Sequence, residues 1–287
     1  MTIPLPGPLV SAAWLHARLA DPLLVILDAS WYLPTMARQP QAEFLAAHLP
    51  GARFFDLDAS SAPDAALPHT LPSEEHFART AQRFGITPAH TVVVYDGSGA
   101  NLSAGRVWWM FRVFGHQRVA VLDGGIGAWR RAGYAIASGE ASASAAVPLY
   151  PAVRNAALVR DADAVQAWLD GAGQLADARP SARFTGEAPE PRPGLRGGHM
   201  PGARSLPFTA VVDADGLLLP PDQLRARFAA AGLDPAAPMI CSCGSGTSAG
   251  ALLLALATLG QDSVPIYDGA WSEWGGDPAR AVVTGPA

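Results

Sequence analysis

Lysine is absent from this chain of 287 residues, so arginine supplies all 20 basic side chains. Without lysine, the protein cannot form a Schiff base through a lysine amine, and it cannot bind phosphate with a P-loop lysine. The formal net charge is −5 and no dense basic run is present. The charge pattern therefore argues against a nucleic-acid partner.

Cysteine is nearly absent as well, because the chain has only Cys241 and Cys243. Two cysteines separated by one residue exclude a disulfide framework, and no other ligands cluster near them to complete a zinc site. We therefore expect no metal. This cysteine usage is typical of a reducing compartment, and we expect a cytoplasmic protein.

Long hydrophobic runs are also missing. The longest apolar run follows Cys243 and is too short to span a bilayer. Residues 1–8 lack the charged and apolar regions of a signal peptide, so we expect none there. The sequence thus predicts no contact with a membrane.

The sequence does contain enough apolar residues, at 49%, to bury a sizeable core. It also repeats itself, with landmarks in the first half recurring 145 to 151 residues later. The paired landmarks are Asp28 with Asp177, His48 with His199, and Asp123 with Asp268. A repeat of this length indicates two domains, which we place at residues 1–140 and 155–287, with a linker near 138–151.

Each half alternates short apolar strands with helical patterns, as in the helix predicted at 74–84 behind a Ser73 N-cap. This alternation predicts an α/β fold in which each domain has a mainly parallel sheet with helices on both faces. Ligands in such folds bind beyond the carboxyl ends of strands, so the crevice between the domains is the expected pocket.

The stretch 238–259 reads as a strand, a glycine-rich turn and a helix, and Cys243 lies in the turn. Gly244 and Gly246 allow several N–H groups to face one point at the helix N-terminus, which favours an anion. A thiol there is expected to be largely ionised near neutrality. A buried structural cysteine is the alternative, and it suits Cys241 in the strand better. We therefore predict that Cys243 is a nucleophile.

These residues resemble the tandem-domain rhodanese superfamily over essentially the whole chain. Within it they resemble the branch that takes sulfur from 3-mercaptopyruvate. The marker is Cys243-Gly244-Ser245-Gly246 without the basic residues that follow the cysteine in thiosulfate-using members. That branch continues with Val-Thr, where this chain has Thr247 and Ser248.

The resemblance implies two tandem rhodanese-like domains and transfer of sulfur through a cysteine persulfide, with release of pyruvate. The expected partners are the small-molecule donor 3-mercaptopyruvate and a thiol, thioredoxin or cyanide acceptor. No cofactor is implied.

The resemblance also implies a catalytic role for Ser245 with His69 and Asp58 of the first domain. The segment Phe54-Phe55-Asp56-Leu57-Asp58, with His69 eleven residues later, carries this match. From the residues alone, loop capping would be the better explanation of Asp58 and His69, and a turn is the alternative for Ser245.

Arg183 and Arg192 match the carboxylate-binding arginines of the family, and an arginine fork suits a carboxylate. Ion pairs with Glu187 and Glu190 on the surface are the alternative. The substrate-binding set is completed by the loop residues Gly244, Gly246, Thr247 and Ser248.

Other motifs are interpreted as structural. Asp177 and Arg179 resemble an ion pair of the family scaffold, and His48 and His199 occur in both halves although only one has a thiol. The tryptophan-rich pieces at 107–111 and 271–274 are expected to pack in the core or between the domains.

Three other functions are weighed. A thiosulfate:cyanide sulfurtransferase is disfavoured because the loop after Cys243 carries no cation. A cysteine phosphatase would need an arginine six residues after the cysteine, where this chain has Ala249. A non-catalytic sulfur carrier would load one persulfide without turnover.

Overall fold

The computed structural model describes residues 3–33 and 36–287. Met1 and Thr2, which belong to the segment considered for a signal peptide, lie outside the described residues. The elements of the first half are β1 (Leu9–Val10), α1 (Ala12–His16), β2 (Leu24–Asp28), α2 (Pro40–Ala46), β3 (Ala52–Phe54), α3 (Glu74–Arg83), β4 (Thr91–Tyr95), α4 (Leu102–Val113), β5 (Val119–Leu122) and α5 (Gly125–Arg131).

The second half repeats this order after a short 3-10 helix, η2 (Ala156–Leu158). Its elements are β6 (Val159–Arg160), α6 (Ala162–Asp170), β7 (Gln174–Asp177), α7 (Ser181–Thr185), β8 (Arg204–Ser205), η3 (Phe208–Val211), α8 (Pro221–Ala230), β9 (Met239–Ser242), α9 (Ala249–Thr258), β10 (Ile266–Tyr267) and α10 (Ala270–Trp274).

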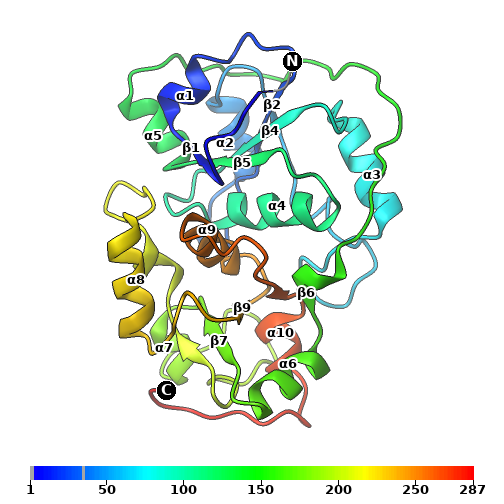
Figure 1. The fold of residues 1–287 in the computed structure, drawn as a ribbon. Coiled ribbons are helices and arrows are strands. Elements are labelled where there is room, and N and C mark those ends of the chain that lie inside the picture. The colour runs from blue at the N-terminus through cyan, green and yellow to red at the C-terminus, as the bar shows by residue number, and fades with distance from the viewer. Residues whose placement is uncertain (1–2, 34–35) are drawn as a thin grey trace.

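The strands form two five-stranded parallel sheets in the described part of the chain (Figure 1). Their orders are β1-β5-β4-β2-β3 and β6-β10-β9-β7-β8, so the second sheet copies the first with every number raised by five. The predicted α/β fold with two repeated parallel sheets is confirmed. All ten strands lie inside the residue ranges that the sequence assigned to the two domains.

Side chains alternate across each sheet because successive residues of a strand point to opposite faces. In β4, Val92 and Val94 face one core while Val93 faces another. The first core also contains α3 and α4, and the second contains α1 and α5. Both faces of the sheet are therefore covered, which explains why its strands are apolar throughout.

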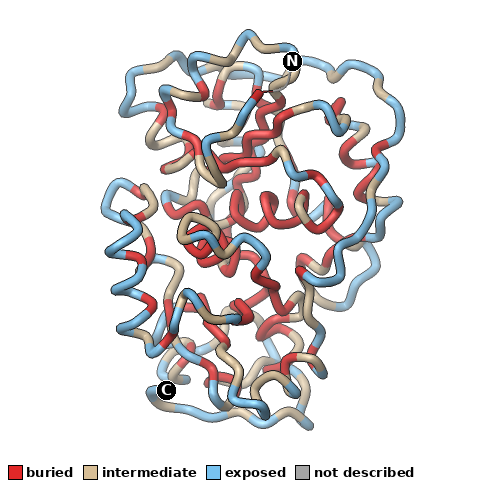
Figure 2. Tube along the Cα trace, in the orientation of Figure 1, coloured by how far each residue is buried: buried red, intermediate tan, exposed pale blue. Residues whose placement is uncertain are grey.

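The inner cores of the two halves merge into one. A single apolar cluster runs from Val25 in β2 to Ile266 in β10. At its centre α4 and α9 cross, and both are buried along their length (Figures 1 and 2). Gly105 and Gly250 meet there so closely that a Cβ on Gly105 would lie 2.6 Å from the carbonyl carbon of Gly250.

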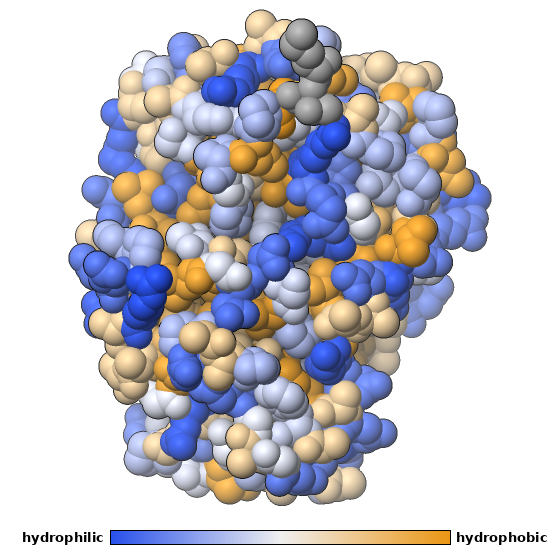
Figure 3. All heavy atoms as spheres, in the orientation of Figure 1, coloured by the Kyte–Doolittle hydropathy of each residue, from blue (hydrophilic) through white to orange (hydrophobic). Residues whose placement is uncertain are grey.

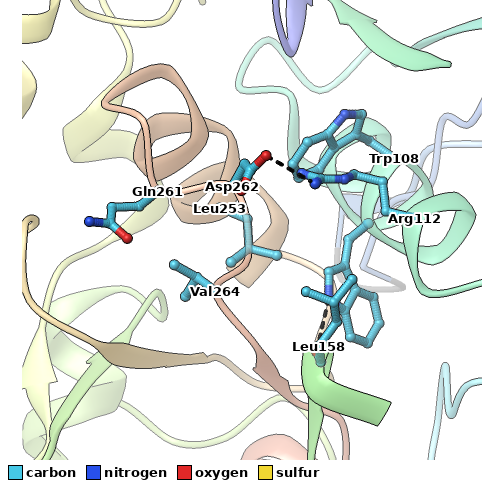
Figure 4. Close-up of a pocket in the computed structure, with 8 residues that line it drawn as sticks. Trp108, Arg112, Leu158, Leu253, Gln261, Asp262 and Val264 are labelled. Atoms are coloured by element: carbon cyan, nitrogen blue, oxygen red, sulfur yellow. Dashed lines mark hydrogen bonds and ion pairs between the residues drawn. The ribbon is translucent and has the colours of Figure 1, made fainter. Parts of the chain in front are cut away.

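We call the contact between α4 and α9 the seam. At its edge, side chains from both halves of the chain meet (Figure 4). The Trp109 indole donates to the Leu158 carbonyl at 3.1 Å, and Arg112 pairs with Asp262 at 3.4 Å. Trp108 and Trp109 are buried in the shared core, and Trp271 and Trp274 are buried beneath the second sheet. The tryptophan-rich pieces therefore act in packing, as predicted.

The segment 138–151 has no helix or strand and runs past α3 before entering the second half (Figure 1). Gln82 of α3 donates to the Val147 carbonyl at 3.0 Å, and buried Tyr150 places its hydroxyl 3.0 Å from His116 Nδ1. The linker is thus fixed to the first domain by specific contacts.

The two repeated histidines occupy equivalent buried positions. His48 Nδ1 lies 2.8 Å from the Phe44 carbonyl, and His199 Nδ1 lies 2.9 Å from the Phe184 carbonyl. Each ring also stacks on that same phenylalanine. This equivalence supports the structural interpretation of both residues.

The surface is mixed in character. On the face drawn in Figure 3, hydrophobic residues are scattered among hydrophilic ones over both domains. Among the residues described, no helix combines the length and the hydropathy needed to cross a bilayer.

Candidate active site

Cys243 lies directly after β9, at the carboxyl end of the second sheet, where α/β folds bind ligands. Its side chain lines a cavity of about 190 Å³ between the domains. First-domain residues Trp31 and Leu102 share the lining with second-domain residues Arg183 and Arg192. Cys243 is only 1% exposed, so a substrate must enter the cavity to reach the sulfur.

Cys241 differs from Cys243 although only one residue separates them. It is fully buried in β9, and burial raises the pKa of its thiol far above the ordinary value. This thiol therefore stays protonated and is not a nucleophile.

The loop after Cys243 presents its backbone N–H groups rather than its carbonyls. The carbonyls of Cys243 and Gly244 accept from Trp271 N and Ser272 N, each at 2.9 Å. Within residues 3–33 and 36–287, no acceptor bonds the N–H groups of 244–248. Gly246 has φ +77°, a left-handed conformation that suits glycine. The loop is therefore built to receive an anion at the start of α9.

Three side chains from the two domains form a hydrogen-bonded row. His69 Nδ1 lies 2.9 Å from Ser245 Oγ, and His69 Nε2 lies 3.0 Å from Asp58 Oδ1. The hydrogen bond from His69 lowers the pKa of Asp58, which therefore remains a carboxylate. Because the carboxylate accepts the Nε2 proton, Nδ1 is left as the acceptor for a hydroxyl.

Two further side chains contact His69 that the sequence did not place there. Thr247 Oγ1 lies 3.0 Å from His69 Nδ1, the same atom that faces Ser245. Trp31 packs edge-on against the ring at 4.5 Å and donates from its indole to Asp58 at 3.1 Å. The signal for Trp31 was its place just beyond the carboxyl end of β2, where a site was expected.

The two predicted arginines lie at the cavity but differ in their partners. Arg192 Nη2 lies 3.5 Å from Ser245 Oγ and forms no ion pair with any described residue. Burial lowers the pKa of Arg192, and the nearby Cys243 opposes that shift. Arg183 pairs with Glu190, whose side chain is 1% exposed, so the expected alternative of a solvated pair is wrong for these two residues.

Glu190 also bonds Arg179 at 2.9 Å, and Arg179 pairs with Asp177 at 2.7 Å. The Arg179 and Asp177 side chains are fully buried, which fits the scaffold ion pair inferred from the sequence. Arg183 is thereby fixed against a rigid network. Gly244 lies beside it, since a Cβ there would be 3.0 Å from Arg183 Nη2.

Comparison with known proteins gives the family. The model of the rhodanese-like domain matches residues 11–132 and 161–277, which together make up most of the chain. The chain belongs to the rhodanese family.

Relatives of known name match nearly the whole of this chain. It is 46% identical over 291 residues to thiosulfate/3-mercaptopyruvate sulfurtransferase 1, mitochondrial, of Arabidopsis thaliana, covering 94% of this chain and 76% of the relative. It is 43% identical over 272 residues to 3-mercaptopyruvate sulfurtransferase of Escherichia coli (strain K12), covering 93% and 94%. The crystal structure of Escherichia coli SseA, a 3-mercaptopyruvate sulfurtransferase by its description, matches with a TM-score of 0.80 at 39% identity, covering 92% of this chain and 99% of that one.

The two rhodanese domains differ at the position of the thiol. Asp28 pairs with Tyr95 as Asp177 pairs with Ser242, so Asp96 is the counterpart of Cys243. The Asp96 carboxylate accepts from the N–H groups of Ser98 and Ala104, each at 2.9 Å. In the first domain the Asp96 carboxylate thus fills the anion-binding turn, whereas the equivalent turn of the second domain is open to a ligand.

No group of three or more histidine, cysteine or acidic side chains arranged to hold a metal was found in the described part of the chain. The cavity itself is lined by a thiol, two guanidinium groups and the Ser245 hydroxyl, and His69 and Asp58 lie behind that hydroxyl.

Proposed function

We propose that the protein transfers sulfur from 3-mercaptopyruvate through Cys243 to an acceptor and releases pyruvate. One observation carries the proposal: a single cavity is lined by the thiol, by two arginines that suit a carboxylate and by Ser245, behind which His69 and Asp58 continue the hydrogen-bonded row. Relatives named for this activity, over 93% of the chain, support the same donor.

In the first half-reaction the Cys243 thiolate attacks the sulfur of the donor. An S–S bond forms, the C–S bond breaks, and its electron pair leaves with the enolate of pyruvate. The thiol proton of the donor moves to the enolate carbon, and Ser245 with His69 provides a path for it. The N–H groups of the loop stabilise the persulfide anion that remains on Cys243.

Binding of the donor is assigned to Arg192 and Arg183. Arg192 has its fork free to take the carboxylate, and Arg183 is braced by Glu190 beside Gly244. A donor held at its carboxylate has its sulfur directed to Cys243, which lowers the entropic cost of the reaction.

In the second half-reaction an acceptor nucleophile attacks the outer sulfur and regenerates the Cys243 thiolate. A small thiol, thioredoxin or cyanide would serve. We place the reaction in the cytoplasm, whose reducing conditions keep thiol acceptors reduced. The scheme needs no cofactor.

The charge around the cavity favours 3-mercaptopyruvate over thiosulfate. Of the two arginines that line the cavity, Arg183 is paired with Glu190, whereas Arg192 forms no ion pair among the described residues and is free to bind the single carboxylate of 3-mercaptopyruvate. Thiosulfate carries two negative charges, and the loop after Cys243 supplies no further cation for it. The Arabidopsis relative is named for both donors, so thiosulfate remains the second candidate.

A donor panel tests the proposal. Pyruvate release and transfer of the outer persulfide sulfur to a thiol are measured with 3-mercaptopyruvate, and thiocyanate formation is measured with thiosulfate and cyanide. We expect many turnovers with the first donor and a lower kcat/KM with the second. A single equivalent of pyruvate per protein would instead indicate a sulfur carrier.

Two matched variants assign the nucleophile. Cys243→Ala is expected to abolish pyruvate release, whereas Cys241→Ala, the same change two residues earlier within β9, is expected to retain it. Full turnover by folded Cys243→Ala would remove this residue from the mechanism.

A further inference from the structure

Asp268 follows β10 in the second domain and reaches across to the first. One of its carboxylate oxygens accepts from Leu71 N at 2.9 Å, and the other accepts from Arg106 at 2.7 Å. Leu71 is two residues after His69, so the contact lies close to the imidazole of the site. A carboxylate from one domain thus fixes the segment that carries the histidine of the other.

Arg106, on α4, completes this contact from the other side. The same nitrogen that bonds Asp268 also donates to the His69 carbonyl at 2.5 Å, and the guanidinium lies over the Trp109 ring. Its other terminal nitrogen lies beneath the loop of the nucleophile, 2.8 Å from where a Cβ on Gly246 would be. The Arg106–Asp268 pair therefore underlies both the His69 segment and the Cys243 loop.

Burial of the Arg106 side chain costs free energy of folding. It is 0% exposed, and its Nε and remaining Nη have no hydrogen-bond partner within the described residues. Unpaired buried donors and a buried charge both work against stability. Arg106 donates two hydrogen bonds, one to Asp268 and one to the backbone carbonyl of His69.

The backbone of His69 needs such support. Its φ is +59°, in the left-handed region that residues with a Cβ seldom occupy. Such a conformation persists only when its surroundings enforce it. Here the pair holds the carbonyl of His69 and the N–H of Leu71, on either side of Thr70.

The first domain offers an internal comparison. Asp123, the counterpart of Asp268, accepts from Leu218 N across the interface at 2.9 Å. Its second partner is the Asn101 side chain at 3.2 Å, and none of the arginines in the described ranges bonds it. The two domains thus exchange equivalent contacts, but only the one beside the thiol includes a buried cation and a histidine.

We infer that Arg106 and Asp268 are positioning residues for sulfur transfer, which hold His69 so that its ring stays within hydrogen-bond distance of Ser245. They touch neither substrate nor the reacting sulfur, and they act through His69. The inference rests on the proposed function, since it concerns the histidine of that mechanism.

Four variants test this role in the full chain. Asp268→Asn keeps the shape but removes the charge that holds Arg106, and Asp123→Asn makes the same change in the equivalent contact. Arg106→Met leaves Asp268 without its cation, whereas Arg106→Met/Asp268→Asn removes both charges at once, so that neither is left buried alone. Steady-state kinetics with 3-mercaptopyruvate, the midpoint of thermal unfolding and the rate of Cys243 alkylation by iodoacetamide are measured for each.

For Asp268→Asn we expect kcat to fall about 10- to 100-fold, because general acid–base catalysis contributes roughly that much or more. KM should change little, since the arginines of the cavity are intact, and alkylation of Cys243 should proceed at the wild-type rate. Asp123→Asn should keep the wild-type kcat. The double variant should unfold at a higher temperature than Arg106→Met alone, yet its kcat should stay low.

Recovery of kcat together with stability in the double variant would overturn the inference, as would a wild-type kcat for Asp268→Asn. A fall in kcat for Asp123→Asn equal to that for Asp268→Asn would mean that the contacts act only through stability. Failure of the proposed function is distinguishable, because the wild-type protein itself would then release no pyruvate from 3-mercaptopyruvate.

Discussion

At the scale of single residues, His69 is shared by two hydroxyl groups. Ser245 and Thr247 lie 2.9 and 3.0 Å from the same ring nitrogen, which has one lone pair to offer them. The resemblance to the family led us to expect a valine at position 247, and Thr247 instead brings a second hydroxyl to His69. Either residue can therefore serve as the partner of His69 when the other is removed.

This arrangement predicts a redundancy between the two hydroxyls. We expect Ser245→Ala to lower kcat about 10-fold, less than the roughly 10²–10⁴-fold typical of a proton-transfer group, because Thr247 still bonds His69. Thr247→Val should stay within about twofold of wild type. The double variant should lose more than the product of the two single losses, which a double-mutant cycle measures. Strict additivity would show that Thr247 does not substitute for Ser245.

Arg192 gives a second prediction at this scale. Arg192→Ala should lower kcat/KM for 3-mercaptopyruvate about 10- to 100-fold, mainly through KM, since hydrogen bonds to charged groups contribute about 1.5–3 kcal/mol. The kcat/KM of Arg192→Lys should lie between those of the wild type and Arg192→Ala, because lysine keeps the charge but lacks the planar guanidinium fork. Arg79→Ala is the control, since that arginine pairs with Glu75 on the exposed side of α3. An unchanged kcat/KM would exclude Arg192 from donor binding.

The sequence could indicate the members of this site but not all of their contacts. Cys243 was recognisable from its glycine neighbours, and His69 and Asp58 from their spacing in a resembling family. The sequence gives no signal for a role of Arg106, because a lone arginine in an apolar helix has no local pattern that distinguishes it. Its partners His69 and Asp268 are 37 and 162 residues away, so only the fold brings them together.

At the scale of elements, local signals predicted the helices well. The helix expected at 74–84 is α3, and Ser73 caps it by accepting from His76 N at 3.1 Å. The apolar run after Cys243 is α9. The crossing of α4 over α9 had no such signal, because it depends on two glycines, Gly105 and Gly250, that lie far apart in the chain.

This crossing gives a prediction of its own. In Gly105→Ala, the new methyl group would lie 2.6 Å from the Gly250 backbone, so the helices must move apart. Overpacking costs about 1–3 kcal/mol, which exceeds the roughly 1 kcal/mol that alanine gains in a helix. We therefore expect urea unfolding to show a lower free energy of unfolding and kcat to fall with it, because Arg106 follows Gly105 directly. Gly7→Ala is the control, since a methyl group there would contact nothing within 4 Å.

A stability of Gly105→Ala equal to that of Gly7→Ala would mean that the seam between the helices can widen without cost. The seam would then be too soft to fix His69 relative to Cys243. The free energy of unfolding of Gly105→Ala therefore tests whether the packing of α4 on α9 supports the active site.

At the scale of the whole molecule, the shared core joins the domains and the linker into one unit. His116 lies at the end of this core, just after α4, and its Nδ1 contacts the hydroxyl of Tyr150 in the linker. The ring is 2% exposed and its Nε2 has no partner among the described residues. Burial lowers the pKa of His116 to about 4.

The direction of the resulting pH dependence follows from that shift. Below an ordinary histidine pKa of about 6.5 the unfolded chain takes up a proton at this position, whereas the folded chain resists until about pH 4. The contribution of neutral His116 to stability is therefore complete above about pH 6.5 and is lost as the pH falls towards 4. The loss amounts to about 3 kcal/mol, at about 1.4 kcal/mol for each pH unit of difference.

His116→Gln should remove this part of the pH dependence, because glutamine fills similar space and does not titrate. Chemical unfolding of both proteins between pH 7 and pH 4 measures it, and the difference between the two curves cancels the contributions of other groups. Parallel curves for wild type and His116→Gln would show that the linker contact at Tyr150 opens without unfolding the rest. The chain would then respond to acid as separate domains, contrary to a core that runs unbroken from β2 to β10.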